Sequence, residues 1–258
     1  METFARPIDA IRRDARQLHA LWKAGALGGE VMPEDVHPRV NRASEDLARY
    51  FTLGMTLNYQ RDSYALWRAC TTTFLDPELA WVFQPERVVA ASIEDLAEAL
   101  LRRRVALQPN RHPLIWRRNA EALVRLADGR VRGLFEREGG NLGRVRAFVQ
   151  EHRASFPYLS GPKLSNYWLY VMSSYMDWPL SNRAALSVAP DRHVIAASRR
   201  LGVIDANEAL GGPLAEQVAM AWRTVLADTE FAPIDLHTPL WLWSRGGFPR
   251  LPGSQGAR

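Results

Sequence analysis

Residues 156–202 read FPYLSGPKLSNYWLYVMSSYMDWPLSNRAALSVAPDRHVIAASRRLG and carry the strongest structural signals of the chain. Within this stretch, Ser160, Gly161 and Pro162 predict a tight turn between two helices. Such a turn directs backbone N–H groups outward at a helix N-terminus, where they can bind a phosphate. Lys163 stands at the start of the second helix, where the positive end of the helix dipole favours the neutral amine over the ammonium. We therefore predict that Lys163 is a nucleophile.

A further helix start follows at Asp191, which comes directly after Pro190. Asp is favoured at the N-cap because its carboxylate accepts hydrogen bonds from the first free amides of the helix. A carboxylate held in this way stays ionised. It can stabilise an oxocarbenium-like sugar or orient a nucleophile. We therefore predict Asp191 as a second catalytic residue, with structural capping as the compatible alternative.

The positive charge of the chain is almost entirely arginine. Of its 33 basic residues only Lys23 and Lys163 are lysines, and the formal net charge is +5. A lysine can form an imine, whereas a guanidinium stays protonated at any ordinary pH. Lys163 is therefore a candidate for chemistry that arginine cannot perform, with chance survival as the alternative. The basic balance also permits binding to nucleic-acid phosphates.

Helical periodicity dominates the rest of the sequence and predicts an all-α fold. Ser44, Asp62 and Ser92 are expected to open helices, because each has a capping side chain and precedes a helical pattern. The single cysteine, Cys70, excludes a disulfide framework and an iron-sulfur site built from several cysteines. No apolar run approaches the length of a membrane span. We expect a soluble, cytoplasmic monomer that uses no metal and no cofactor.

Together these stretches resemble the helix-hairpin-helix DNA glycosylases. The resemblance lies in the pattern Gly161, Lys163 and Asn166 after the turn, and in Asp191 and His193 at the later helix start. In bifunctional members such as endonuclease III and the 8-oxoguanine glycosylases, the residue matching Lys163 is the Schiff-base nucleophile. The residue matching Asp191 is the essential carboxylate. The spacing between the two is wider than in endonuclease III and is similar to that of the archaeal 8-oxoguanine glycosylases.

The resemblance also implies binding residues. Residues 57–62 (LNYQRD) resemble a family stretch in which the glutamine, here Gln60, reaches toward the gap left by a flipped base. The expected DNA contacts are Gln60, Ser160, Gly161, Asn166 and His193. A flipped base needs an aromatic or apolar slot, for which we expect Trp241, Trp243 and Tyr167.

The same resemblance implies two helical subdomains, a helix-hairpin-helix element and an active site in the cleft between the subdomains. The expected subdomains are residues 1–57 with 178–258, and residues 58–177. Residues 247–258 are expected to form a disordered tail.

The expected function is excision of a damaged base from double-stranded DNA, with abasic-site lyase activity and an oxidised purine such as 8-oxoguanine as the substrate. Two alternatives remain open from the sequence. The same scaffold can hydrolyse the N-glycosidic bond of a modified nucleotide or RNA component. It can also bind distorted duplex DNA without catalysis.

Overall fold

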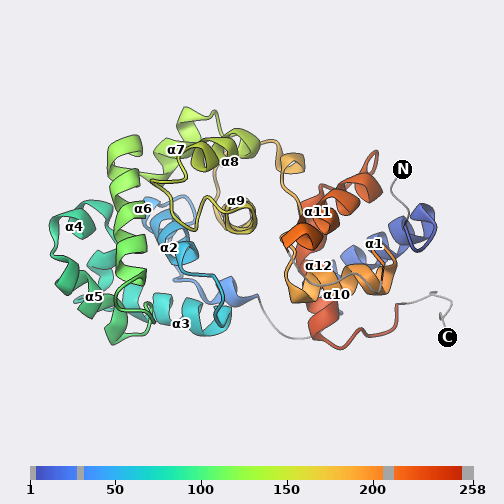
Figure 1. Ribbon diagram of the computed structural model, residues 1–258, viewed down its shortest axis with the longest axis horizontal. Helices are drawn as coiled ribbons and strands as arrows, with labels where there is room; N and C mark the ends of the chain where they lie inside the picture. Colours follow the sequence, from blue (N-terminus) through green and yellow to red (C-terminus); the bar gives the residue numbers. More distant parts are fainter. Residues whose placement is uncertain (1–3, 28–31, 206–211, 252–258) are drawn as a thin grey trace. The chain divides into compact units, whose positions relative to one another are not determined.

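The computed structural model describes residues 4–27, 32–205 and 212–251. These residues form twelve α-helices and four short 3-10 helices, and their only β-type pairing is an isolated bridge between Asn141 and Ser181. The predicted all-α fold is therefore confirmed (Figure 1). None of the described helices combines the length and the apolar character needed to cross a membrane.

The chain divides into two compact units. The smaller unit consists of Met1–Met32 together with Ala184–Arg258, and the larger unit is Pro33–Arg183. The boundaries differ from those we predicted at 57/58 and 177/178. The first boundary moves because α2 (Glu45–Thr56) packs against helices of the larger unit and not against the chain ends. The second moves because residues 178–183 bond back to the larger unit, with Leu142 N donating to Ser181 O at 3.1 Å.

The larger unit is built around α2. The other helices of this unit are α3 (Ser63–Phe74), α4 (Pro85–Ala90), α5 (Ile93–Arg102), α6 (His112–Ala127), α7 (Val131–Arg137), α8 (Leu142–Glu151) and α9 (Pro162–Tyr175). Helices α3, α6, α7 and α9 all pack on α2, which is buried along its whole second half. Its core partners include Trp67 and Trp168, both fully buried. The Trp168 indole keeps its hydrogen bond by donating to Thr52 Oγ1 at 3.0 Å.

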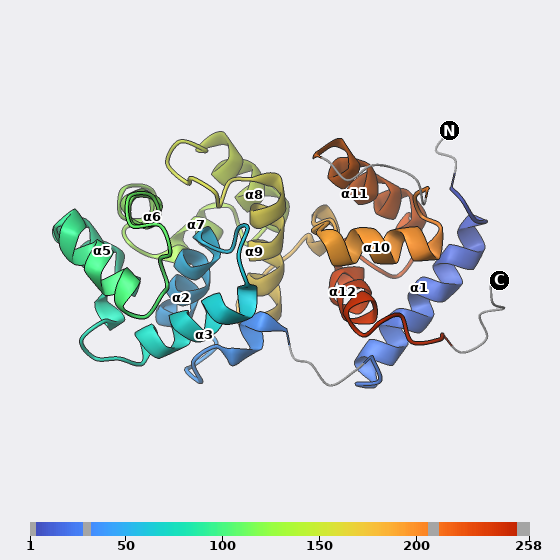
Figure 2. The same cartoon turned by 60° about the horizontal axis from the view of Figure 1, so that its bottom comes forward.

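The smaller unit joins the two ends of the chain. It contains α1 (Ile8–Lys23), α10 (Arg192–Leu201), α11 (Gly212–Leu226) and α12 (His237–Arg245). Helix α10 packs mainly on α12, and α1 lies against α12 (Figure 2). Arg6 fastens the N-terminal segment to α10, because its guanidinium donates to Asp14 Oδ2 at 2.8 Å and to Leu201 O at 3.1 Å. An ion pair with a buried carboxylate and a helix carbonyl thus hold the N-terminal segment in this unit.

Part of the predicted disordered tail is ordered. Trp243 Nε1 donates to Pro249 O at 2.8 Å, and the Trp243 ring meets Phe248 edge-on at 4.9 Å. Leu251 is buried. Residues 247–251 therefore pack onto α12, which corrects the prediction for this part of the tail. Residues 252–258 lie outside the described residues.

Capping side chains open the helices where the sequence predicts them. Ser44 accepts from the amide of Leu47, and Asp62 accepts from that of Ala65. Ser92 accepts from the amide of Asp95 at 3.0 Å. Each cap satisfies an amide that the helix itself leaves without a partner, so the three predicted helix starts are confirmed.

Candidate functional site

Lys163 is the second residue of α9 and its side chain is exposed. Its amine makes no hydrogen bond and no ion pair within the part of the chain that the structure describes. The backbone amides of Lys163 and Leu164 likewise donate to no described group. The reason is local, because the N-cap residue Gly161 has no side chain to accept from them. The start of α9 therefore presents one free amine and two free amides.

The turn before α9 uses its own amides. In this segment, residues 152–161 and hereafter the α8–α9 turn, Ser160 N donates to Phe156 O at 3.0 Å and Gly161 N donates to Tyr158 O at 2.9 Å. A Cβ on Gly161 would lie 3.1 Å from Tyr158 O, which explains why glycine fits here. These two amides are therefore engaged within the turn, and the predicted DNA contacts of Ser160 and Gly161 stay predictions. The donors left for an anion are the next two amides, on α9 itself.

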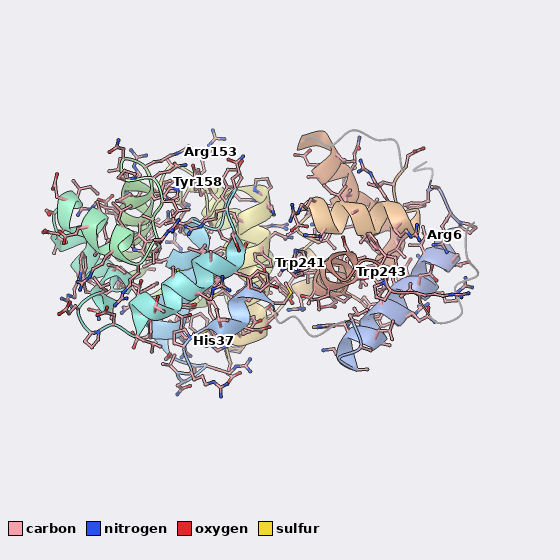
Figure 3. The ribbon with its side chains drawn as sticks, turned by 90° about the horizontal axis from the view of Figure 1, so that it is seen from below. Arg6, His37, Arg153, Tyr158, Trp241 and Trp243 are labelled. Atoms are coloured by element: carbon pink, nitrogen blue, oxygen red, sulfur yellow. The ribbon has the colours of Figure 1, made fainter. Side chains whose placement is uncertain are left out.

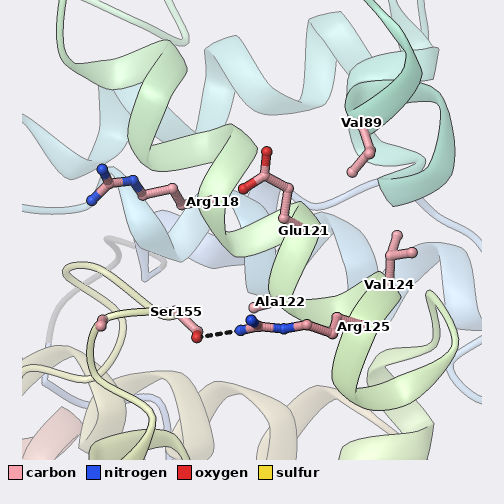
Figure 4. Close-up of a pocket in the computed structure, with 8 residues that line it drawn as sticks. Val89, Arg118, Glu121, Ala122, Val124, Arg125 and Ser155 are labelled. Atoms are coloured by element: carbon pink, nitrogen blue, oxygen red, sulfur yellow. Dashed lines mark hydrogen bonds between the residues drawn. The ribbon is translucent and has the colours of Figure 1, made fainter.

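The α8–α9 turn is fastened to α6. Asn119 Nδ2 donates to Pro157 O at 3.1 Å. Six residues further along α6, Arg125 Nη2 donates to Ser155 Oγ at 2.6 Å (Figure 4). At the other end of α6, the Arg111 guanidinium lies over the Tyr158 ring at 5.2 Å. Three contacts along one helix therefore fix the position of the turn that leads into Lys163.

The loop of residues 57–62, hereafter the Gln60 loop, lies beside this turn. The Tyr59 and Tyr158 rings are 5.4 Å apart, and Tyr59 is 48% exposed. Gln60 is exposed and has a φ of 50°, a left-handed conformation that is unusual for a residue with a side chain. Arg61 braces the loop by donating to Val105 O at 2.6 Å. The two stretches predicted to contact DNA, around Gln60 and before Lys163, thus meet within one unit.

Sequence reasoning missed Tyr59 and Tyr158, the residues that join these two stretches. Both belong to the larger unit, and Figure 3 labels Tyr158 together with Arg153 of the same turn. Tyr59 could have been found, since it directly precedes Gln60. Tyr158 gives no such signal, because its left-handed φ of 65° and its contact with Arg111 arise only from the folded turn.

Asp191 is the N-cap of α10 in the smaller unit. Its Oδ1 accepts from the amides of His193 at 2.9 Å and Val194 at 3.0 Å. Its Oδ2 accepts from Trp241 Nε1 at 3.1 Å. The predicted N-cap is therefore confirmed, and α12 supplies an indole donor that the sequence did not reveal. Three donors hold this carboxylate in one orientation.

His193 and Trp241 complete the surroundings of Asp191. The two rings meet edge-on at 5.4 Å, and the Arg245 guanidinium lies over the Trp241 ring at 5.1 Å. Burial lowers the pKa of His193, although the charge of Asp191 acts in the opposite direction. The imidazole is therefore neutral near pH 7. His193 Nδ1 lies 3.3 Å from Ser244 Oγ, so this histidine links the start of α10 to α12.

Trp243 does not share the surroundings of Trp241. Residues two apart on a helix point in directions about 200° apart, and the two indoles lie on opposite sides of α12 (Figure 3). Trp241 faces Asp191, whereas Trp243 faces Pro249. The two tryptophans therefore have different neighbours, and their predicted place in a base slot stays a prediction.

Two predicted residues of α9 are buried. Asn166 is 3% exposed and its Oδ1 accepts from Arg146 Nη1 at 3.2 Å, an arrangement that fits a structural residue better than the predicted DNA contact. Tyr167 is buried, and its hydroxyl donates to Glu34 Oε2 at 2.7 Å. Burial raises the pKa of Glu34 to about 7, and the Tyr167 hydrogen bond only partly opposes this shift. The part of Tyr167 in a base pocket stays a prediction.

Among the described residues, no three His, Cys, Asp or Glu side chains gather as a metal site would require. Burial raises the pKa of the Cys70 thiol to about 12, so Cys70 carries no thiolate near neutral pH. Lys163 lies in the larger unit and Asp191 in the smaller one. Their convergence on one substrate atom therefore stays a prediction.

No protein-family model matches the chain, and no curated protein matches it.

Proposed function

We propose that the protein is a DNA base-excision glycosylase with abasic-site lyase activity, acting on an oxidised purine such as 8-oxoguanine in double-stranded DNA. The observation that carries the proposal is the exposed Lys163 amine, which has no partner among the described residues. An ammonium is disfavoured at a helix N-terminus, so stability does not account for a lysine at this position.

The other lysine has an ordinary structural explanation. Lys23 is the last residue of α1, where the negative end of the helix dipole favours a cation. Its ammonium lies 4.4 Å from the centre of the Trp22 ring, a cation–π contact. The Lys23 ammonium therefore has a stabilising contact, whereas the Lys163 amine has no partner among the described residues and stays available to attack a substrate.

The residues suggest how the reaction would proceed. A backbone phosphate would accept from the free amides of Lys163 and Leu164, while the Gln60 loop fills the space left by the extruded nucleotide. The amine of Lys163 attacks C1′ of the deoxyribose with its lone pair, the N-glycosidic bond breaks, and the electron pair of that bond leaves with the base, which takes up a proton. Asp191 stabilises the positive charge that develops on the sugar.

The lyase step follows from the covalent intermediate. The amine passes a proton to O4′, the C1′–O4′ bond breaks and opens the sugar ring, and the nitrogen lone pair forms an iminium between Nζ of Lys163 and C1′. Loss of a proton from C2′ then expels the 3′ phosphate, and water finally releases the amine. No cofactor takes part in these steps.

One observation favours a second candidate function, hydrolysis of a free nucleotide. The amides of Ser160 and Gly161 bond within the α8–α9 turn, so this turn offers fewer donors to a duplex than we predicted. This favours the alternative in which the protein hydrolyses the N-glycosidic bond of a free modified nucleotide.

Borohydride trapping separates these possibilities. The protein is incubated with a duplex that contains 8-oxoguanine, and borohydride reduces any imine to a stable adduct. We expect an adduct with the wild type and with Lys23→Gln, and none with Lys163→Gln. Base release from free 8-oxo-deoxyguanosine without duplex binding would instead support the nucleotide hydrolase. Duplex binding without an adduct or base release would support a non-catalytic binder.

A further inference from the structure

A cavity of about 480 Å³ lies behind the Gln60 loop in the larger unit, hereafter the arginine cleft. One wall is a face of α3, and the other is the segment that follows α5. The polar side chains that line it are Arg61, Asp62, Arg68, Thr72, Arg103 and Arg104. Four arginines and one aspartate therefore line this cavity.

The positive charge of the arginine cleft is poorly balanced. Asp76 pairs with Arg103 at 2.9 Å, and Asp62 already caps α3. Arg68 and Arg104 are exposed, and neither side chain has a hydrogen bond or ion pair within the ranges that the structure describes. At least two cationic charges thus remain without an acidic partner in this cleft.

Arg61 adds a third unbalanced charge. Its guanidinium donates to the backbone oxygens of Val105 and Arg104, which carry no formal charge, at 2.6 and 3.1 Å. Its Nε is buried and has no hydrogen-bond partner among the described residues. Burial lowers the pKa of Arg61 and outweighs the opposing effect of Asp62, while the charge of Arg104 adds a smaller lowering effect. An anion in the cleft would stabilise the charged guanidinium.

The backbone conformation of Arg104 also supports an anion site. Arg104 follows Arg103, the C-cap of α5, and has a φ of 61°. Glycine is the usual residue at this left-handed position after a helix, because a side chain is strained there. An exposed arginine with no acidic partner is held at a place where glycine would be more stable. Stability therefore does not explain this residue, whereas binding of an anion would.

The position of the cleft identifies the anion. Arg61 directly follows Gln60, whose loop contacts the α8–α9 turn through Tyr59 and Tyr158. We infer that the arginine cleft binds a backbone phosphate of the duplex strand that passes the Gln60 loop. This inference rests on the proposed function, since it requires duplex DNA as the partner. The contact is to the phosphate and not to a base, so it adds affinity without sequence preference.

Arg104→Gly and Arg68→Gln test the inference. Binding to a fluorescent duplex is measured by anisotropy at several salt concentrations, together with the Tm of each variant. Each substitution should weaken binding about tenfold at low salt and reduce the slope of log K against log salt by about 0.9, the share of one phosphate. The Tm of Arg104→Gly should not fall below that of the wild type, since glycine relieves the left-handed strain.

Arg87→Gln is the matched control. Arg87 is an exposed arginine of α4 that lines a different cavity, with Trp81 and Asp95. The substitution removes one positive charge, as the two cleft substitutions do, but removes it outside the arginine cleft. The salt slope of this variant should therefore stay within error of the wild type. Inorganic phosphate at millimolar concentration should raise the Tm of the wild type by no more than that of Arg104→Gly and Arg68→Gln; a rise in the wild type that these two variants lack would show that the cleft binds free phosphate and would overturn the duplex assignment.

The outcomes separate this inference from the proposed function. If wild-type protein forms the borohydride adduct but Arg104→Gly and Arg68→Gln bind duplex as Arg87→Gln does, the arginine cleft is not a phosphate site and the glycosylase proposal stands. If the wild type binds no duplex, both fail. Weaker binding by the two cleft variants alone, with an intact Tm, supports the inference.

Discussion

The starts of α9 and α10 differ in how their first amides are satisfied. At α10, Asp191 accepts from two of these amides and also from the Trp241 indole, so this helix start contains its own anion. At α9, Gly161 offers no side-chain acceptor, and the amides of Lys163 and Leu164 and the side-chain amine of Lys163 have no described partner. The first amides of α10 thus have a charged acceptor, whereas those of α9 have no acceptor among the described residues.

This difference suits the two roles that we propose. A carboxylate that stabilises charge on a sugar gains from a fixed position, because it then needs no reorganisation during the reaction. A nucleophilic amine must instead be free to approach carbon, and an adjacent pair of free amides can accept the phosphate that positions the sugar. If these roles are correct, substitutions at the start of α10 should change the rate of base excision more than the stability of the protein.

The largest effect is expected from Asp191→Asn. Asparagine is as good an N-cap as aspartate, so α10 should keep its start, with a loss of about 1 kcal/mol at most from the Trp241 hydrogen bond. Removing the negative charge should lower the rate of base excision about 1,000-fold, which corresponds to about 4 kcal/mol. Single-turnover excision assays and thermal unfolding measure the two effects separately.

Asp191→Ala provides the control for this prediction. It removes the cap as well as the charge, so its stability should fall by a further 1–2 kcal/mol or so while its rate stays close to that of Asp191→Asn. If Asp191→Asn retained the wild-type rate and only Asp191→Ala lost activity, Asp191 would be a cap and nothing more.

The next effect concerns the body of α9, which Tyr167 ties to Glu34. The pKa of Glu34 is raised to about 7 in the folded protein, above its ordinary value of 4.5. Folding therefore favours the protonated carboxyl, and this contribution is complete below about pH 4.5 and is lost as the pH rises through about 7. The loss amounts to about 3 kcal/mol.

Glu34→Gln isolates this pH dependence, because glutamine still accepts from the Tyr167 hydroxyl but does not titrate. Denaturant unfolding is compared at pH 5 and pH 8. The variant should gain about 3 kcal/mol relative to the wild type between these two values. An unchanged difference in the free energy of unfolding across this range would show that Glu34 is ionised in the folded protein throughout.

The smallest effect is expected from Trp241→Phe. It removes the indole donor to Asp191 and should lower the excision rate about fivefold, or about 1 kcal/mol, because the carboxylate is then less well fixed. Trp243→Phe is the matched control, since it removes the indole donor to Pro249 on the opposite side of α12. Equal losses of rate in both variants would mean that the Trp241 contact serves only the stability of α12.

The helix starts were the most predictable part of the fold. Ser44, Asp62, Ser92 and Asp191 each act as the N-cap that the sequence indicates, because capping depends on one side chain and amides two or three residues away. The short helices α4 and α7 were not predicted. Six or seven residues are too few for a clear periodic pattern, and such helices depend on tertiary packing.

The surroundings of the candidate site were less predictable, because they depend on contacts between distant residues. Nothing in the sequence pairs Glu34 with Tyr167, or Tyr59 with Tyr158, which are about 100 or more positions apart along the chain. The sequence analysis assigned Trp241 and Trp243 to the same base slot, although these two side chains of α12 bond to different partners. Left-handed backbone at Gln60 likewise follows from the folded loop and not from the residue type.

The most direct test is to locate the borohydride-trapped adduct by peptide mass spectrometry. Trypsin does not cleave at a modified lysine, so an adduct on Lys163 would appear on the uncleaved peptide of residues 154–183. We predict that the deoxyribose remnant is found there. An adduct confined to Lys23 or to the N-terminal amine, with residues 154–163 and 164–183 released as unmodified peptides, would contradict the account.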